Sequence, residues 1–175
     1  MRRAAAIVLV LMSSAVATAA CTGDDGPVEG VVPVDEAMPR VTGESLDGDP
    51  VDSGELAGSP YVVNVWATWC APCEAELPAL VDVAGRYDGR VGFLGINYVD
   101  DAANARRWQR DYAIPYPSVD DQAGAFADDL GFPYLPHTLV VDRAGRLRYR
   151  IFGETTAEEL SGLLDGLLAE GGVSG

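Results

Sequence analysis

The sequence predicts a single α/β domain in which a central β-sheet is flanked by helices. Residues 61–66 and 91–98 are two continuous runs of mostly apolar residues, which are typical of strands buried on both faces of a sheet. Each run is followed by a segment predicted to be helical, so strands and helices alternate along the chain. The 175 residues, 48% of them hydrophobic and 22% charged, are enough for one domain with a proper core.

Residues 1–21 are predicted to be an export signal. Arg2 and Arg3 precede an apolar run that is too short to span a membrane comfortably, and small residues lead up to Cys21. Residues 18–21 resemble a lipobox, so Cys21 is expected to become a lipidated N-terminus. The alternatives are ordinary signal cleavage, which would leave Cys21 as a spare thiol, and an uncleaved anchor.

Residues 22–38 show no periodicity and are predicted to form a flexible tether. Five acidic residues lie there among Gly, Pro and Val, with no basic residue. Acidic linkers repel themselves and stay extended, which would hold the domain away from an anionic membrane. Residues 39–171 would then form the domain, and residues 172–175 a disordered tail.

The charge balance argues against nucleic acid as a partner. The chain has 12 basic and 27 acidic residues and a net charge of −15, and removal of Arg2 and Arg3 with the signal makes it more negative. Such a surface repels phosphates and anionic headgroups. We therefore expect proteins, and not nucleic acids, to be its partners.

The first part of the domain is predicted to hold a hairpin and then a buried strand. Residues 46–51 carry a turn signal between two short strand candidates, and residues 53–56 form a possible helical turn. Asn64 interrupts the apolar strand at 61–66. A buried amide needs partners, so we expect Asn64 to bond backbone groups beneath the following site rather than to act directly in catalysis.

Residues 66–78 carry the strongest chemical signal, two cysteines three positions apart where the strand gives way to a helix. They share one helix face and can close into a disulfide. Cys70 lies where free backbone N–H groups and the helix dipole stabilise a thiolate, so it is the expected nucleophile and Cys73 the resolving thiol. Pro72 suits the first helical turn, which needs no N–H from it.

Glu76 continues the same spacing one turn below the cysteines, within reach of a proton leaving Cys73. Burial beside the thiols should raise its pKa toward neutrality, which would suit a proton-transfer group. The alternative is a carboxylate that merely lies on the helix surface. Pro78 lacks the N–H that would bond the Glu74 carbonyl, so the helix is expected to bend just after the active turn.

The cysteine pair could also be half of a zinc site, which would need two further Cys or His ligands at suitable spacing. The remaining candidates are Cys21, at the end of the export signal, and His137. These cannot complete such a site. A redox-active dithiol is therefore favoured, and we expect no metal and no cofactor.

The middle of the chain is predicted to add two helices and a short strand. The helix after the dithiol should end near residues 85–89, and Asp100 or Asp101 should cap the next helix. Three arginines on that next helix are expected to form a solvated face. A short segment around residues 118–119 then precedes a helix that ends at Gly131.

The last part of the chain is predicted to form a hairpin and a helix. Residues 138–142 and 147–152 flank a turn that contains glycine. In the second strand three arginines alternate with apolar residues, a pattern typical of an edge strand. Thr155 or Thr156 should cap a final helix whose leucines form a stripe facing the core.

Two motifs, WCAPCEAELP at 69–78 and LPHTLVVD at 135–142, resemble the thioredoxin superfamily, and specifically its exported, membrane-anchored TlpA and ResA proteins. The resemblance covers about residues 39–170. It implies a thioredoxin-like fold with a central mixed sheet flanked by helices, an N-terminal β-hairpin extension and a central αβ insertion.

The resemblance also implies the site residues. Cys70 and Cys73 would form the redox disulfide, and Glu76 matches the active-site glutamate of the family. A cis peptide bond before Pro136 would pack against the cysteines, align a substrate backbone and keep metals off the thiols. His137 stands where the family usually has threonine; it could add positive charge near Cys70 below neutral pH, although we favour a plain polar residue at a strand start. The supporting residues are Trp69, Pro72, Asn64, Leu135 and His137.

We therefore expect a monomeric thiol-disulfide oxidoreductase on the outer face of the cell membrane. The resemblance implies reduction of exported proteins such as apocytochrome c, with electrons from a membrane thiol carrier. The reducing direction is also favoured by Ala71 and Pro72, which bring no cation to stabilise the Cys70 thiolate. The alternative is an oxidase or isomerase that forms disulfides in secreted proteins. A Sco-type copper chaperone would need three residues between its cysteines, whereas this chain has two. A peroxiredoxin-type peroxidase would need a threonine four positions ahead of its cysteine-containing turn, an arrangement that this chain lacks.

Overall fold

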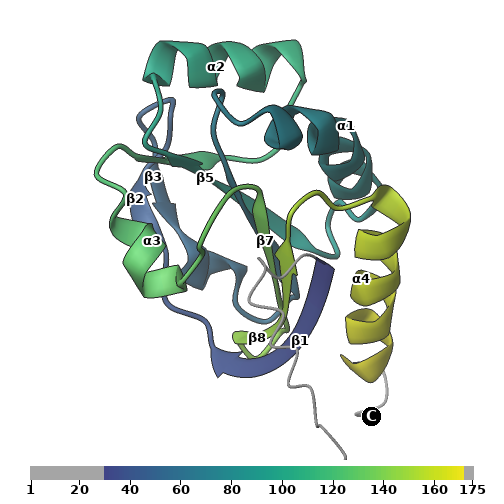
Figure 1. The fold of residues 1–175 in the computed structure, drawn as a ribbon. Coiled ribbons are helices and arrows are strands. Elements are labelled where there is room, and N and C mark those ends of the chain that lie inside the picture. The colour runs from purple at the N-terminus through teal and green to yellow at the C-terminus, as the bar shows by residue number, and fades with distance from the viewer. Residues whose placement is uncertain (1–29, 172–175) are drawn as a thin grey trace, which may run out of the picture.

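A mixed β-sheet forms the centre of the computed structural model, which describes residues 30–171 (Figure 1). Its strands are β1 (Gly30–Ala37), β4 (Tyr61–Trp66), β5 (Gly92–Tyr98), β6 (Ser118–Asp121), β7 (His137–Val141) and β8 (Arg146–Phe152). They lie in the order β1-β8-β7-β4-β5-β6. The central strand β4 runs parallel to β5 and antiparallel to β7, so the thioredoxin-like arrangement that the sequence indicated is confirmed.

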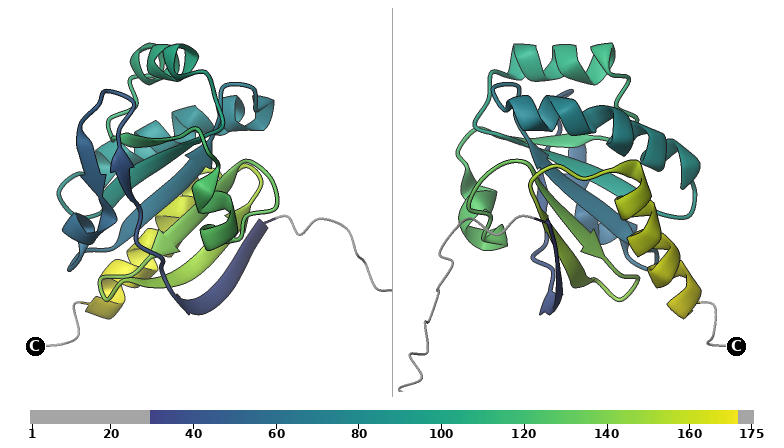
Figure 2. Two further views of the ribbon diagram at one scale, coloured as in Figure 1. Left: turned by 90° about the vertical axis from the view of Figure 1, so that its left-hand side faces the viewer. Right: turned by 45° about the vertical axis from the view of Figure 1, so that its right-hand side comes forward.

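Within residues 30–171, four α-helices surround the sheet (Figure 2). They are α1 (Ala71–Arg86), α2 (Ala102–Asp111), α3 (Ala125–Leu130) and α4 (Ala157–Gly171). Side chains of α1, α2 and α4 pack together on one face of the sheet, and α3 packs on the other. Within the described part of the chain, no helix has the length and apolar character needed to cross a membrane.

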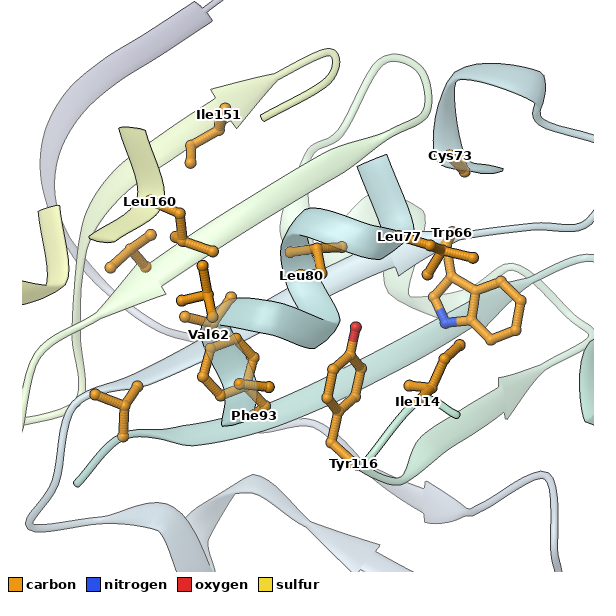
Figure 3. Packing of buried hydrophobic residues seen from close by; sticks show 14 of the residues in the cluster. Val62, Trp66, Cys73, Leu77, Leu80, Phe93, Ile114, Tyr116, Ile151 and Leu160 are labelled. Carbon is orange, nitrogen blue, oxygen red and sulfur yellow. The ribbon is translucent and has the colours of Figure 1, made fainter. Parts of the chain in front are cut away.

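Strand β4 is buried on both faces because its alternate side chains enter two separate clusters. Val62 and Trp66 enter the cluster that also holds Leu77 of α1 and Leu160 of α4, and Trp66 lies beside Leu77 (Figure 3). Val63 and the other odd-numbered residues of the strand pack into the cluster beneath α3. This two-sided packing fixes the carboxyl end of β4, from which the cysteine loop emerges.

The predicted N-terminal hairpin is present as a separate two-stranded antiparallel sheet of β2 (Thr42–Glu44) and β3 (Pro50–Asp52). A short 3₁₀-helix, η1 (Ser53–Leu56), follows. Asp52 caps η1, since its carboxylate accepts a hydrogen bond of 2.8 Å from the N–H of Gly54.

Strand β1 corrects two predictions. The proposed tether at 22–38 is wrong for residues 30–37, because they pair antiparallel with β8; the domain therefore includes residues before 39. The proposed edge strand β8 is consequently an interior strand, between β1 and β7. Two acidic residues of the predicted tether form ion pairs with arginines of β8, which were predicted to protect a sheet edge. Asp35 pairs with Arg146, and Glu36 pairs with Arg150 at 2.9 Å.

Other predicted segments lie outside the described residues. These are the export signal at 1–21 with the proposed lipidation site Cys21, the part of the tether at 22–29 and the tail at 172–175.

The predicted helix caps are confirmed. Asp101 caps α2, because its carboxylate accepts the Asn104 N–H at 2.9 Å. Thr156 accepts the Glu159 N–H at 3.1 Å at the start of α4, and the Thr155 hydroxyl donates to the Glu159 carboxylate at 3.0 Å. The leucine stripe of α4 faces the core as predicted: Leu160, Leu164 and Leu167 are buried, and Leu163 and Leu168 are partly buried against the same cluster.

The arginine face of α2 is only partly solvated. Arg107 and Arg110 are exposed, whereas Arg106 is half-buried and donates to the Leu46 carbonyl at 3.0 Å. The helix is thereby tied to the loop of the N-terminal hairpin.

Candidate active site

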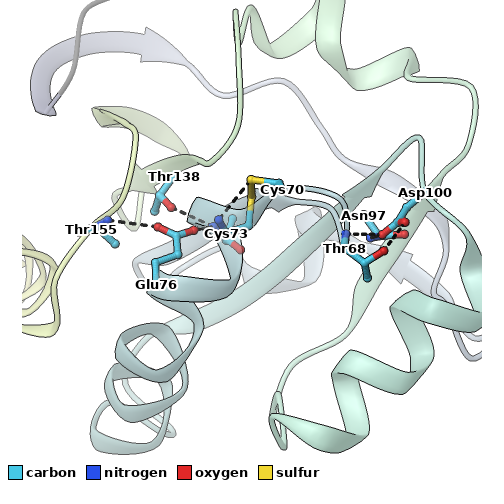
Figure 4. The surroundings of a disulfide bond; sticks show 9 residues. Thr68, Cys70, Cys73, Glu76, Asn97, Asp100, Thr138 and Thr155 are labelled. Atoms are coloured by element: carbon cyan, nitrogen blue, oxygen red, sulfur yellow. Dashed lines mark hydrogen bonds between the residues drawn. A yellow bond between two sulfur atoms is a disulfide. The ribbon is translucent and has the colours of Figure 1, made fainter.

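The loop that leaves β4 places Cys70 at the N-cap of α1 and Cys73 in its first turn (Figure 4). The two sulfur atoms are joined in a disulfide of 2.09 Å. The Cys73 N–H donates to the Cys70 sulfur at 3.2 Å. Cys70 retains 5% exposure and Cys73 none, so Cys70 is the cysteine that solvent can reach.

Glu76 lies one helical turn below the disulfide and is only 2% exposed. One carboxylate oxygen accepts the Asn64 side-chain amide at 2.8 Å, and the other accepts the Thr155 N–H at 3.2 Å. Burial raises the pKa of Glu76 to about 8; the two hydrogen bonds oppose this rise, and the charge of Glu154 adds to it. The carboxyl therefore titrates close to neutral pH, in the range where a group can both take and release protons.

Asn64 connects this carboxyl to the neighbouring strand. Its side-chain amide donates to Glu76 and, at 3.1 Å, to the hydroxyl of Thr138, which lies directly opposite on β7. The expectation that Asn64 would bond backbone groups is wrong, because both of its donor contacts are to side chains. Alternation along β4 turns Asn64 toward α1, where a carboxyl and not a free backbone group lies above it.

The peptide bond between Leu135 and Pro136 is cis, as the resemblance implied, and β7 begins at the next residue. A hollow of about 450 Å³ opens between this segment and Cys70, and a second, of about 520 Å³, lies beyond Leu135. The first has walls that are mainly apolar and aromatic, among them Trp69, Tyr98, Phe132, Tyr134 and Leu135. Such a groove beside a reactive sulfur can take an extended polypeptide.

His137 begins β7 as predicted, but its ring is fully buried. The ring lies 4.6 Å from that of Phe152, centre to centre, and neither ring nitrogen has a hydrogen-bond partner within residues 30–171. Burial, helped by the charge of Arg150, lowers the pKa of His137 to about 4. The suggestion that it supplies a positive charge just below neutral pH is therefore wrong.

Asp100 is a site residue that the sequence reasoning assigned only to a possible helix cap. It is 8% exposed, and its carboxylate accepts the Thr68 N–H at 2.6 Å and the Thr68 hydroxyl at 2.6 Å. The Asn97 amide at 2.9 Å and the Asp101 N–H at 2.8 Å also donate to it. The parallel pairing of β4 and β5 could have revealed this contact, because the loops after parallel strands emerge at the same edge of the sheet.

Trp69 is an exposed aromatic side chain at the site, with 59% of its surface accessible. Its indole N–H donates to the Val99 carbonyl at 3.0 Å, and its ring meets that of Tyr98 edge-on. Both residues that precede Cys70 are thus bonded to the loop after β5.

The chain matches the Redoxin family model over residues 33–167. It is 35% identical over 155 residues to the thiol:disulfide interchange protein DsbE of Vibrio cholerae, a match that covers 85% of this chain and 83% of that protein. It is 26% identical to the thiol-disulfide oxidoreductase ResA of Bacillus thuringiensis, over 90% of this chain and 91% of the relative. Several other proteins named DsbE are matched over about half to two thirds of their length.

A solved structure supports the same grouping. It is a secreted Mycobacterium tuberculosis disulfide oxidoreductase described as homologous to Escherichia coli DsbE. The two chains superpose with a TM-score of 0.67 at 28% identity, over 73% of this chain and 96% of the other.

Proposed function

The chain belongs to the Redoxin family and is a thiol-disulfide oxidoreductase of the DsbE and ResA type, and from this premise we propose that it reduces disulfides in exported proteins. The substrate class that we favour is the oxidised cysteine pair of an apocytochrome c. The electrons would come from a membrane thiol carrier that reduces the Cys70–Cys73 disulfide again.

In the proposed reaction the Cys70 thiolate attacks one sulfur of a substrate disulfide, and the other substrate sulfur leaves as a thiolate. Cys73 then loses its proton and attacks Cys70, which releases the second substrate sulfur and closes the disulfide. Two electrons pass from the dithiol to the substrate. The assignment of Cys70 as the attacking thiol rests on its N-cap position and its residual exposure.

Glu76 is the proposed acceptor of the Cys73 proton. It lies one turn from Cys73 on the same helix, its burial excludes water as a competing base, and a pKa of about 8 lies close to that of a thiol. The proton taken from Cys73 is returned to Cys73 when the disulfide is reduced again.

The apolar setting of Cys70 carries the proposed direction. Its sulfur accepts one backbone N–H, while the hollow beside it has mainly apolar and aromatic walls. Apolar surroundings raise the pKa of a thiol, whereas strong oxidants depend on a stabilised thiolate. The apolar surroundings of Cys70 therefore support a reductase over an oxidase or isomerase.

The proposed location is the outer face of the cell membrane. The signal-like residues 1–21, the lipobox-like cysteine Cys21 and the secreted relative support it. A lipid at Cys21 would keep the domain close to a membrane-embedded carrier.

The equilibrium of the Cys70–Cys73 couple with glutathione tests the direction. A potential near that of thioredoxin, roughly −270 mV, supports the reductase, and one more oxidising than about −180 mV favours disulfide formation in secreted proteins. The attacking thiol is tested by trapping: Cys73→Ser should accumulate mixed disulfides through Cys70, whereas Cys70→Ser should accumulate none. Equal trapping by both variants contradicts the assignment.

A further inference from the structure

The loop after β5, residues 99–101, bonds to both residues that lead into Cys70. Thr68 gives its N–H and its hydroxyl to the Asp100 carboxylate, each at 2.6 Å. Trp69 gives its indole N–H to the Val99 carbonyl at 3.0 Å. These contacts are separate from the hydrogen bonds around Glu76, which involve Asn64, Thr138 and Thr155.

The Asp100 carboxylate is itself held in place. The Asn97 amide, fully buried on β5, donates to it at 2.9 Å, and the Asp101 N–H donates at 2.8 Å. Together with Thr68, four donors converge on two oxygens. A carboxylate fixed in this way is a rigid acceptor, because any rotation breaks several charge-assisted hydrogen bonds at once.

The same loop holds a strained residue. Val99 has a φ of 43°, a left-handed conformation that a β-branched residue rarely adopts, and its side chain is 45% exposed. Its N–H donates to the Asp121 carbonyl at 3.0 Å. Strain of this kind persists only where neighbouring bonds enforce it, and it gathers at functional sites. Here it turns the Val99 carbonyl toward the Trp69 indole.

The backbone of residues 67–70 connects Thr68 and Trp69 to the Cys70 sulfur. The Cys70 N–H bonds back to the Ala67 carbonyl at 3.2 Å, so residues 67–70 form one turn with Thr68 and Trp69 inside it. At the end of this turn the Cys70 sulfur accepts the Cys73 N–H. A shift of Thr68 therefore moves Cys70 relative to the first N–H groups of α1.

We propose that Asp100, acting through Thr68, is a positioning residue for Cys70 in the proposed thiol exchange. It holds the sulfur of the reduced protein against the start of α1, where the Cys73 N–H and the helix dipole stabilise the attacking thiolate. Without the Asp100–Thr68 contact this stabilisation weakens, so a smaller fraction of Cys70 is thiolate at neutral pH.

Other ionisable groups also surround the Cys70 sulfur. Cys73 and Glu76 lie on α1 beneath it, and Tyr98 and Tyr134 line the hollow beside it. The substitution Thr68→Val changes none of these groups and leaves Asp100 in place. An altered Cys70 ionisation in that variant therefore reports position and not charge.

The test measures alkylation of Cys70 by iodoacetamide against pH in the full chain carrying Cys73→Ser, with the Cys70 peptide followed by mass spectrometry. Thr68→Val, which keeps the shape but loses the hydroxyl, should raise the midpoint of the pH profile by about one unit and slow alkylation at pH 7 about tenfold. Thr68→Ser keeps the hydroxyl and should restore the original profile.

Asp100→Asn separates position from charge. Removal of a nearby negative charge alone would lower the Cys70 pKa and speed alkylation. Loss of positioning should instead raise the pKa and slow alkylation, as in Thr68→Val. Asp101→Asn is the matched control, because asparagine also caps a helix and the Asp101 backbone N–H is retained.

An unchanged profile in Thr68→Val, or faster alkylation in Asp100→Asn, overturns the proposal. If Asp100→Asn does not fold, the comparison of Thr68→Val with Thr68→Ser decides alone. Because alkylation needs no protein substrate, a parent chain that fails to exchange disulfides would refute the proposed function and leave this result intact.

Discussion

Two buried carboxyl groups lie on opposite sides of the disulfide, and their surroundings differ (Figure 4). Glu76 is 2% exposed and accepts two hydrogen bonds, whereas Asp100 is 8% exposed and accepts four. Burial disfavours a charged carboxylate, and hydrogen-bond donors compensate for it. These surroundings suit Glu76 to the proposed exchange of a proton, and Asp100 to the proposed role of a fixed acceptor for the cysteine loop.

The difference arises from the elements that supply the donors. Glu76 projects from a helix toward a strand side chain, Asn64, and one backbone N–H, that of Thr155. Asp100 lies in a loop, where two backbone N–H groups, an amide and a hydroxyl can turn toward it. The same chemical group therefore suits the proposed proton transfer on one side and the proposed positioning of Cys70 on the other.

The largest expected effect is on the pH dependence of stability. The folded pKa of Glu76 is about 8, above its ordinary value of 4.5. As pH rises from 4.5 to 8 the unfolded chain releases this proton while the native protein keeps it, so the free energy of unfolding falls, by up to about 5 kcal/mol. Urea unfolding of wild type and Glu76→Gln across this range should show that the stability of the variant increases relative to that of wild type as pH rises.

The difference in unfolding free energy between Glu76→Gln and wild type is plotted against pH. A mismatched hydrogen bond to the glutamine would shift this difference by the same amount at every pH and would not change its slope. A difference that does not vary between pH 4.5 and 8 would show that Glu76 is ionised throughout, like an ordinary surface carboxylate.

The next effect is kinetic. Glu76→Gln cannot accept the Cys73 proton, so release of a mixed disulfide should slow by about 100-fold at pH 7, a usual contribution of general base catalysis. Stopped-flow reduction of a disulfide peptide measures this step. Glu74→Gln, an exposed residue on the same helix, is the matched control and should leave the rate unchanged.

Substitution of Asp100 should change the free energy of unfolding more than it changes the rate of proton transfer. Asp100→Asn replaces an acceptor oxygen by an NH₂ group among groups that all donate, so the free energy of unfolding should drop by about 2 kcal/mol. Urea unfolding at constant pH measures this loss. A loss as small as that of Asp101→Asn would mean that the four hydrogen bonds contribute little.

The smallest effect concerns the strain beside Asp100. Val99→Gly should be more stable than Val99→Ala by about 1 kcal/mol, because glycine adopts a positive φ without steric cost. At a position with an ordinary negative φ, the glycine variant would instead be less stable than the alanine variant. Thermal unfolding of both variants gives the sign, and a more stable alanine variant would remove the strain argument.

Local spacing explains what the sequence could predict of the site. Cys70, Cys73 and Glu76 follow one another at helical spacing, so their arrangement depends on a single helix. The burial that raises the Glu76 pKa was also foreseeable, since the glutamate lies beneath the dithiol on the face that packs against the sheet. The cis bond before Pro136 came from family resemblance alone.

The missed features depend on which strands pair. Asp100 meets Thr68 only because β4 and β5 run parallel and side by side, and no local pattern connects residues so far apart in sequence. Strand β1 was missed because Pro33 and a register shift interrupt its pattern, and its acidic residues looked self-repelling until the arginines of β8 were placed beside them.

The carboxyl titration of Glu76 tests the division between the two carboxyl groups most directly. Carbon-13 labelling of glutamate side chains, with the Glu76 signal assigned by its loss in Glu76→Gln, gives that titration by NMR in the oxidised protein. We expect a midpoint near pH 8, because burial raises the pKa of Glu76 to about 8. A midpoint below about pH 5, in the range of an exposed glutamate, would contradict it.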